Sequence, residues 1–243
     1  MSRKIMLLAI PLVLLISAAP ALSGQVLATS EDQFDFGYAP QESKVSHVFW
    51  LYASDVEPVW IKEVKPGCGC TQAPLETDFL EPGDSTRLEI TFKTGRYVNR
   101  TVKRPTILIE GHDNVAIDII TYVVTRPDST YPLMLDPYKI DLSQYGTTVR
   151  DRASFKITNV SDRDLNVKVV AGPDEYGTVT MPETIRAGET VEVPFQLKEG
   201  SIRRSFESSF TFELSDDSHS RYTIPVRRRF HDPNAVTLTA PGN

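Results

Sequence analysis

The sequence predicts an all-β protein built from two tandem immunoglobulin-like β-sandwiches that follow a signal peptide. Two observations predict the sandwiches. Short runs of β-branched or aromatic residues alternate with turn residues along the chain, and no long stretch shows the apolar period of a helix. The second half of the chain also repeats the pattern of the first half at an offset of about 105 residues.

The first 23 residues have the three parts of a secretory signal peptide. Arg3 and Lys4 precede an apolar run from Ile5 to Ile16, and small residues follow. That run is shorter than the roughly 20 apolar residues that cross a bilayer. We therefore expect cleavage after residues 1–23, no stable membrane span afterwards, and a periplasmic or secreted protein.

The internal repeat supplies the domain boundaries and the expected core. At matched positions, apolar residues recur with a period of two, which places them on the inward side of strands. The matched pairs are Phe49 with Phe155, Leu51 with Ile157, Ile61 with Val167, and Ile90 with Phe195. We predict one sandwich over residues 24–128, a second over 129–231, and a flexible tail over 232–243.

Composition narrows the partners and the source of stability. The formal net charge is −6, which disfavours binding to nucleic acid or to an anionic membrane. The basic run Arg227–Arg229 is the exception, and we expect its side chains to be solvated charges on an edge strand. The chain has only two cysteines, separated by one glycine, so they cannot link distant segments and the fold must be held by packing.

The motif Cys68–Thr71 is the largest difference between the two repeats. It aligns with Pro173–Tyr176, so the sandwich fold itself does not require the cysteines. On an extended segment the two sulfurs lie on the same side, and the intervening Gly69 lets them converge.

Three interpretations of Cys68 and Cys70 are open. Two thiolates can bind a soft ion such as Cu(I), or Zn(II) with added ligands, although no histidine lies within 15 residues of either cysteine. They can form a small, strained disulfide suited to thiol exchange. They can also be small apolar side chains in a tight turn, with a purely structural role. No cofactor is expected unless the Cu(I) interpretation holds.

Three aromatic residues of the first repeat are predicted to face outward. Trp50 and Tyr52 alternate with inward-facing residues, and Trp60 does the same on the next strand, while their counterparts in the second repeat are polar. Outward aromatics form contact surfaces for a partner, for a sugar or for the neighbouring domain. By the same alternation, His47 faces inward, and we expect it to be a hydrogen-bonded histidine at the core or its rim.

The first repeat resembles the bacterial domain-of-unknown-function family DUF1573. The resemblance covers about Gln33 to Val124 and rests on Phe34–Gly37, Val45–Phe49, Glu57–Val64, Cys68–Thr71 and Glu81–Asp84. It implies a domain of the ASH/Hydin immunoglobulin-like class, typically exported, with no settled biochemical role. Two positions depart from the family pattern: Ala53 replaces an asparagine, which Asn159 retains in the second repeat, and Gly67 replaces a serine.

No phosphate-binding loop, nucleophile elbow or metalloprotease motif is present in the sequence. We therefore predict a non-enzymatic binding or scaffolding protein of the bacterial cell envelope, whose partner is another envelope protein contacted through Trp50, Tyr52 or Trp60. The alternative is a thiol site at Cys68 and Cys70 that handles a soft metal or exchanges disulfides.

Overall fold

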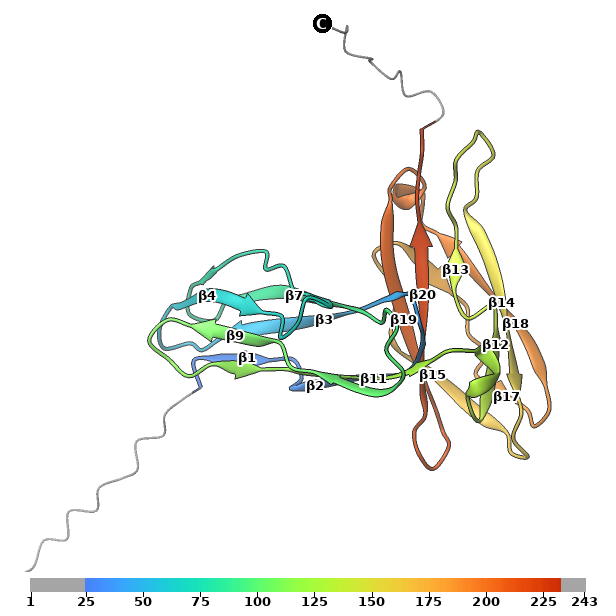
Figure 1. Ribbon diagram of the computed structural model, residues 1–243. Helices are drawn as coiled ribbons and strands as arrows, with labels where there is room; N and C mark the ends of the chain where they lie inside the picture. The colour runs from blue at the N-terminus through green and yellow to red at the C-terminus, as the bar shows by residue number, and fades with distance from the viewer. Residues whose placement is uncertain (1–24, 233–243) are drawn as a thin grey trace, which may run out of the picture.

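The computed structural model describes residues 25–232, and these form two β-sandwiches (Figure 1). The predicted signal peptide and nearly all of the predicted tail lie outside the described residues. Strands dominate both sandwiches, and the only helices in the described part are the short 3-10 turns η1 (Pro127–Ser129) and η2 (Glu199–Ser201). The predicted all-β, immunoglobulin-like fold class is confirmed.

The first sandwich packs two layers of strands against each other. One sheet contains, in order, β1 (Leu27–Thr29), β3 (Lys44–Ala53), β7 (Ser85–Lys93) and β5 (Thr71–Gln72). A second sheet contains β10 (Val115–Ala116), β9 (Thr106–Ile109), β4 (Val59–Lys65) and β6 (Phe79–Leu80). The remaining strands, β2 (Gln33–Pro40), β11 (Asp118–Val124) and β8 (Asn99–Lys103), pair in that order and belong to a sheet that continues into the second sandwich.

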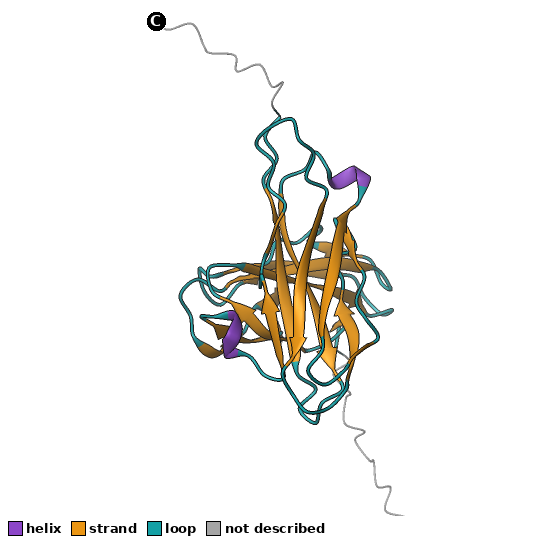
Figure 2. Cartoon of the chain, turned by 90° about the vertical axis from the view of Figure 1, so that its right-hand side faces the viewer, coloured by secondary structure: helices purple, strands orange, loops and turns teal. Residues whose placement is uncertain are grey.

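The first sheet of the second sandwich has the same arrangement of strands as the β1-β3-β7-β5 sheet of the first sandwich. One sheet contains β12 (Leu133–Asp136), β14 (Arg152–Asn159), β18 (Thr190–Leu197) and β16 (Gly177–Val179). The other contains β17 (Thr184–Ile185), β15 (Leu165–Ala171), β19 (Phe206–Leu214) and β20 (Arg221–Arg228), with β13 (Ile140–Asp141) paired to β20. Figure 2 shows that these strands run across those of the first sandwich.

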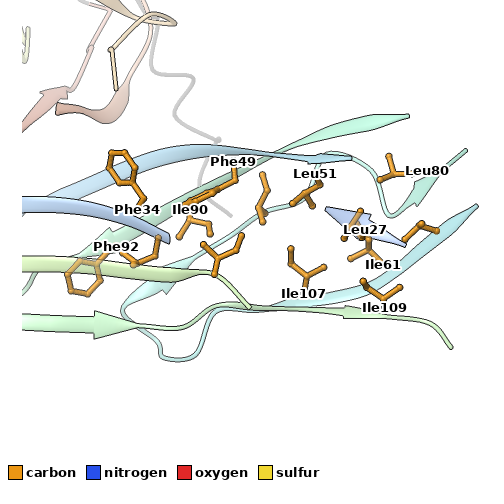
Figure 3. Packing of buried hydrophobic residues seen from close by; sticks show 14 of the residues in the cluster. Leu27, Phe34, Phe49, Leu51, Ile61, Leu80, Ile90, Phe92, Ile107 and Ile109 are labelled. Atoms are coloured by element: carbon orange, nitrogen blue, oxygen red, sulfur yellow. The ribbon is translucent and has the colours of Figure 1, made fainter. Parts of the chain in front are cut away.

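Each sandwich has its own hydrophobic core. The core residues of the first lie between Val26 and Val123, and those of the second between Val124 and Val226. Figure 3 shows Phe49, Leu51 and Ile90 packed between the two layers of the first sandwich. Seven of the eight residues predicted from the repeat to face inward are buried; the eighth, Val167, is partly buried against its core.

The turn before β7 and the turn before β18 have matching hydrogen bonds. Asp84 N donates to Glu81 O and Glu189 N donates to Arg186 O, both at 3.0 Å. In the reverse direction, the side-chain carboxylates of Asp84 and Glu189 accept from the backbone N–H groups of Glu81 and Arg186. The predicted sequence offset therefore aligns residues with the same local geometry.

Asn159 illustrates how the two sandwiches differ at a matched position. Its buried side-chain amide donates to Arg163 O at 2.7 Å and to Ile185 O at 3.0 Å, and its Oδ1 accepts from Ser161 N. These bonds hold the β14–β15 turn against β17. Ala53, at the matched position, has no polar side-chain group, so the first sandwich lacks this network.

The two sandwiches are joined through backbone pairing as well as through the linker. Strand β2 pairs with β11 of its own sandwich and, at Tyr38 with Tyr222, with β20 of the second. A β-bulge in the β2–β11 pairing, between Ile120 and Tyr122, coincides with Gly37, whose φ is +61°. A Cβ at Gly37 would lie 2.1 Å from Arg221 O, so only glycine permits this approach.

Hydrogen bonds surround this junction. Thr223 Oγ1 donates to Phe36 O at 2.6 Å, and Tyr138 OH donates to Tyr38 O at 2.8 Å. On the neighbouring strands, Ser46 N donates to Ser209 Oγ, which in turn donates to Ser46 O. Burial raises the pKa of the Tyr138 hydroxyl, so it stays a neutral donor at physiological pH.

The prediction for Arg227–Arg229 is correct in part: Arg227 and Arg229 are exposed, but Arg228 is buried and the strand is not an edge. Strand β20 lies between β19 and β2, so it is an inner strand of the continuous sheet and needs no edge protection. Arg228 is fully buried, and its guanidinium donates to the carbonyl oxygens of Leu142, Arg150 and Ile202. The three consecutive arginines look alike in the sequence, so the sequence does not indicate that carbonyl groups enclose the side chain of Arg228.

Replacing Gly37 by Ala tests the junction. We expect it to lower the free energy of unfolding by more than about 3 kcal/mol, because the left-handed conformation and the contact with Arg221 O both penalise a Cβ. The matched control is Gly111→Ala, where φ is +74° but no atom lies within 4 Å, and we expect a loss of about 1–2 kcal/mol. Equal losses in urea unfolding would contradict a rigid contact at Gly37.

Candidate functional site

The segment Cys68–Thr71 connects β4 to β5 at one end of the first sandwich. Gly67, just before it, has φ +77°, and a Cβ there would lie 3.1 Å from Arg104 O. Glycine therefore lets the turn pass close to the chain between β8 and β9. A Cβ at Gly69 would meet nothing within 4 Å, so the turn opens outward at the point between the two cysteines.

Cys68 and Cys70 are joined in a disulfide, with their Cα atoms 5.2 Å apart. Both residues are half-buried, and Cys70 packs against the hydrophobic core. The backbone of Cys70 is also held in place, because its carbonyl oxygen accepts from Lys93 N at 2.7 Å. Cys68 is not among the residues packed against this core, and its carbonyl oxygen accepts from Thr71 N at 3.2 Å.

Polar hydrogens surround the sulfur atoms. Tyr97 OH donates to Cys70 Sγ at 3.5 Å, and Lys103 Nζ donates to Tyr97 OH at 3.2 Å and lies 4.3 Å from the centre of the Tyr97 ring. Thr71 Oγ1 lies 3.4 Å from Cys68 Sγ and 3.9 Å from Cys70 Sγ. A hydroxyl and an ammonium group are thus arranged in a chain that ends on Cys70.

The segment that supplies Tyr97 and Lys103 is basic, although the chain as a whole is acidic. The segment from 93 to 104 contains no acidic residue and five basic ones, Lys93, Arg96, Arg100, Lys103 and Arg104. Arg96 pairs with Glu42, and Arg104 pairs with Asp118 at 2.6 Å. The hydrogen bond from Arg104 holds the pKa of the Asp118 carboxyl below its ordinary value.

Tyr97 and Lys103 were not among the residues predicted from the sequence. They lie more than 25 positions from the cysteines, and only the fold brings the β7–β8 connection beside the β4–β5 turn. The absence of acidic residues between 93 and 104 was the available signal. It did not indicate which basic side chain would reach a sulfur.

The matched segment of the second sandwich contributes to the junction. Glu175 forms an ion pair of 3.4 Å with Arg87 of the first sandwich and one of 3.1 Å with Arg204. Tyr176 stacks on Phe206 with 4.1 Å between ring centres. At this position one sandwich therefore has a disulfide and the other has a contact between the sandwiches.

The three outward aromatics divide between two faces. Trp50 and Tyr52 are 44% and 45% exposed on β3, while Trp60 is 51% exposed on β4 of the opposite layer and packs on Phe79. The structure therefore gives no single surface containing all three. The second sandwich contacts β3 at Ser46 and β7 at Arg87, which pairs with Trp50. Trp50 and Tyr52 nevertheless remain exposed, so neither is packed between the sandwiches.

His47 lies at the rim of the first core, as predicted. Its ring stacks on Phe34 with 3.6 Å between centres, and its Nε2 lies 2.6 Å from Glu31 Oε1. The stacking on Phe34 and the hydrogen bond with Glu31 account for the position of His47. Within residues 25–232, no three His, Cys, Asp or Glu side chains are grouped so as to hold a metal ion, and a soft ion such as Cu(I) would need the disulfide to be reduced first.

Comparison with protein families confirms the resemblance of the first sandwich. Residues 27–122 match the family described as "Protein of unknown function (DUF1573)". No curated protein matches the chain. None of the helices in the described residues is long and apolar enough to span a membrane.

Solved structures with similar folds come from varied proteins. A protein of unknown function from Porphyromonas gingivalis is 12% identical, with 84% of this chain and 100% of that chain covered and a TM-score of 0.35. The ASH/PapD-like domain 7 of human CEP192 is 9% identical, covering 48% and 98%, with a TM-score of 0.38. The Pseudomonas aeruginosa CupB2 chaperone is 10% identical, covering 82% and 98%, with a TM-score of 0.29. Such low values carry no argument about function.

The disulfide is expected to contribute little to global stability. It closes a loop with a sequence separation of 2, for which the chain-entropy relation gives about 2 kcal/mol or less. We expect the variant Cys68→Ser/Cys70→Ser to fold and to melt no more than about 6 °C below the native protein. Thermal unfolding of the native protein with and without a reductant is the control, and it should show a similar shift. Loss of folding in the variant would mean that the disulfide is a structural element.

Proposed function

We propose that this protein is an exported, non-enzymatic binding or scaffolding protein of the bacterial cell envelope, and that it binds another envelope protein through Trp50 and Tyr52. The observation that carries this proposal is the exposure of two large aromatic side chains, two residues apart on the same face of β3. Paired aromatics on an otherwise polar surface supply much of the binding energy in protein interfaces.

The surroundings of the aromatic pair favour a protein partner. Strand β1, next to β3, is the edge of its sheet within residues 25–232, because it pairs there with β3 alone. Its outer backbone groups can accept an added extended segment, and Tyr52 lies beside Ala28 of this edge. A partner strand at β1 would therefore have aromatic side chains within reach.

Two further features support the export and scaffolding parts of the proposal. The predicted signal peptide agrees with a disulfide between Cys68 and Cys70, since disulfides persist in oxidising compartments. The backbone pairing at Tyr38 and Tyr222 holds the two sandwiches in one orientation. A binding face on the first sandwich is then presented at a fixed angle to the second.

A photo-crosslinking residue at Ser85, which pairs with Tyr52 across β3 and β7, tests the binding face in the envelope of the source bacterium. We expect one reproducible protein adduct. Its yield should fall at least about fivefold in Trp50→Ser/Tyr52→Ser, because truncation of aromatic anchors costs 1 kcal/mol or more each.

The matched control is Trp60→Ser, which removes an equally exposed aromatic from the opposite face and should leave the Ser85 adduct unchanged. An adduct that survives the double substitution would place the contact elsewhere. An adduct lost only in Trp60→Ser would move the binding face to β4.

A further inference from the structure

The arrangement of side chains around the two sulfur atoms points to a function separate from the aromatic face. We propose that the Cys68–Cys70 disulfide is a thiol–disulfide exchange site for a protein dithiol, in which Cys68 is the sulfur attacked and Cys70 is the leaving group. The proposal rests on the asymmetry between the two cysteines. It is independent of Trp50 and Tyr52.

The direction of attack follows from the packing of Cys70. Cys70 packs against the hydrophobic core and its carbonyl oxygen accepts from Lys93 N, whereas Cys68 is not among the residues packed against that core. The space around the Cα of Gly69 is open, so an incoming thiolate can approach the outer side of the turn. An attacking sulfur approaches in line with the S–S bond, and attack on Cys68 leaves Cys70 in its enclosed position.

The choice of leaving group follows from the hydrogen bonds. A departing thiolate leaves faster, and is more stable, when positive charge and hydrogen-bond donors face it. Tyr97 OH already donates to Cys70 Sγ, and the Lys103 ammonium donates to the same hydroxyl. This chain strengthens when Cys70 becomes an anion, because a hydrogen bond to a charged sulfur is stronger than one to a neutral disulfide.

The exchange has two steps, and its atoms and electrons balance. A thiolate of the partner forms a bond to Cys68 Sγ, the Cys68–Cys70 bond breaks, and its electron pair remains on Cys70 Sγ as a thiolate beside Tyr97 and Lys103. The second thiolate of the partner then attacks its own sulfur in the mixed disulfide and releases Cys68, which takes a proton from water. The partner dithiol is oxidised to a disulfide, and the Cys68–Cys70 disulfide is reduced to a dithiol.

Charge defines the class of partner. Lys103 is connected to Cys70 through Tyr97 and forms no ion pair within the described residues. Uncompensated positive charge near the disulfide attracts thiolates and acidic surfaces. The site therefore fits a dithiol set in an acidic surface, and its rate of reaction should fall as salt is added.

Equilibration of the whole mature protein with glutathione buffers tests the proposal. The measured quantity is the value of [GSH]²/[GSSG] at which half of the protein is reduced. We expect this value to rise roughly tenfold in Tyr97→Phe and in Lys103→Met, because each loses part of the stabilisation of the Cys70 thiolate. The matched controls are Tyr122→Phe and Lys62→Met, which change an exposed tyrosine and an exposed lysine with no contact to either sulfur.

Mass spectrometry of the trapped intermediate tests the direction of attack. After brief exposure of the oxidised protein to glutathione and acid quenching, we expect the glutathione adduct on Cys68. Adduct on Cys70, a midpoint that moves less than twofold in both variants, or a disulfide that stays oxidised throughout the buffer series in the folded protein would each overturn the proposal. Circular dichroism of each variant establishes that it is folded. The Ser85 crosslink does not depend on these residues, so the two proposals fail separately.

Discussion

The approach of Gly37 to Arg221 is the constraint on which the arrangement of the molecule depends. At this point β2, which stays paired with β11 of the first sandwich, also meets β20 of the second, and no side chain fits between their backbones. Because of the bulge at Gly37, β2 contributes to both sandwiches. Phe36 is buried in the first core, and Tyr38 packs against Tyr222 at the edge of the second core. Hydrogen bonds from Thr223 and Tyr138 then fix the position of the two sheets.

The rigid junction determines which surfaces remain available. It covers the start of β3 at Ser46 and engages the Pro173–Tyr176 segment through Glu175. The junction also reaches Arg87, the cross-strand partner of Trp50, but Trp50 and Tyr52 remain exposed beside it. Within residues 25–232, the hydrogen bonds of the disulfide turn between β4 and β5 join it to the first sandwich and none reaches the second. The two proposed activities therefore belong to the first sandwich, while the second sandwich supplies the support that holds the first in place.

The sequence was sufficient to predict the fold class and the inward-facing residues, because alternation of apolar residues and the internal repeat both depend on local geometry. Phe49, Ile90 and Phe155 are buried for the reason predicted. The exposure of Trp50 and Tyr52 was predictable in the same way. The environment of Cys70 was not, since Tyr97 and Lys103 approach it only after β7, β8 and the β4–β5 turn have packed together. The prediction for Arg228 failed for a related reason. The order of strands in a sheet decides whether a strand is an edge, and the residue pattern of a single strand does not reveal that order.

The continuous sheet through β20, β2 and β11 has a consequence for how such a chain evolves. A sandwich joined to its neighbour by a linker alone can be duplicated, transplanted or lost as a separate unit. Here, removal of either sandwich would strip the other of backbone partners and expose Tyr38 or Tyr222 to water. A change that removes one sandwich therefore also alters the backbone pairing and the exposed surface of the one that remains.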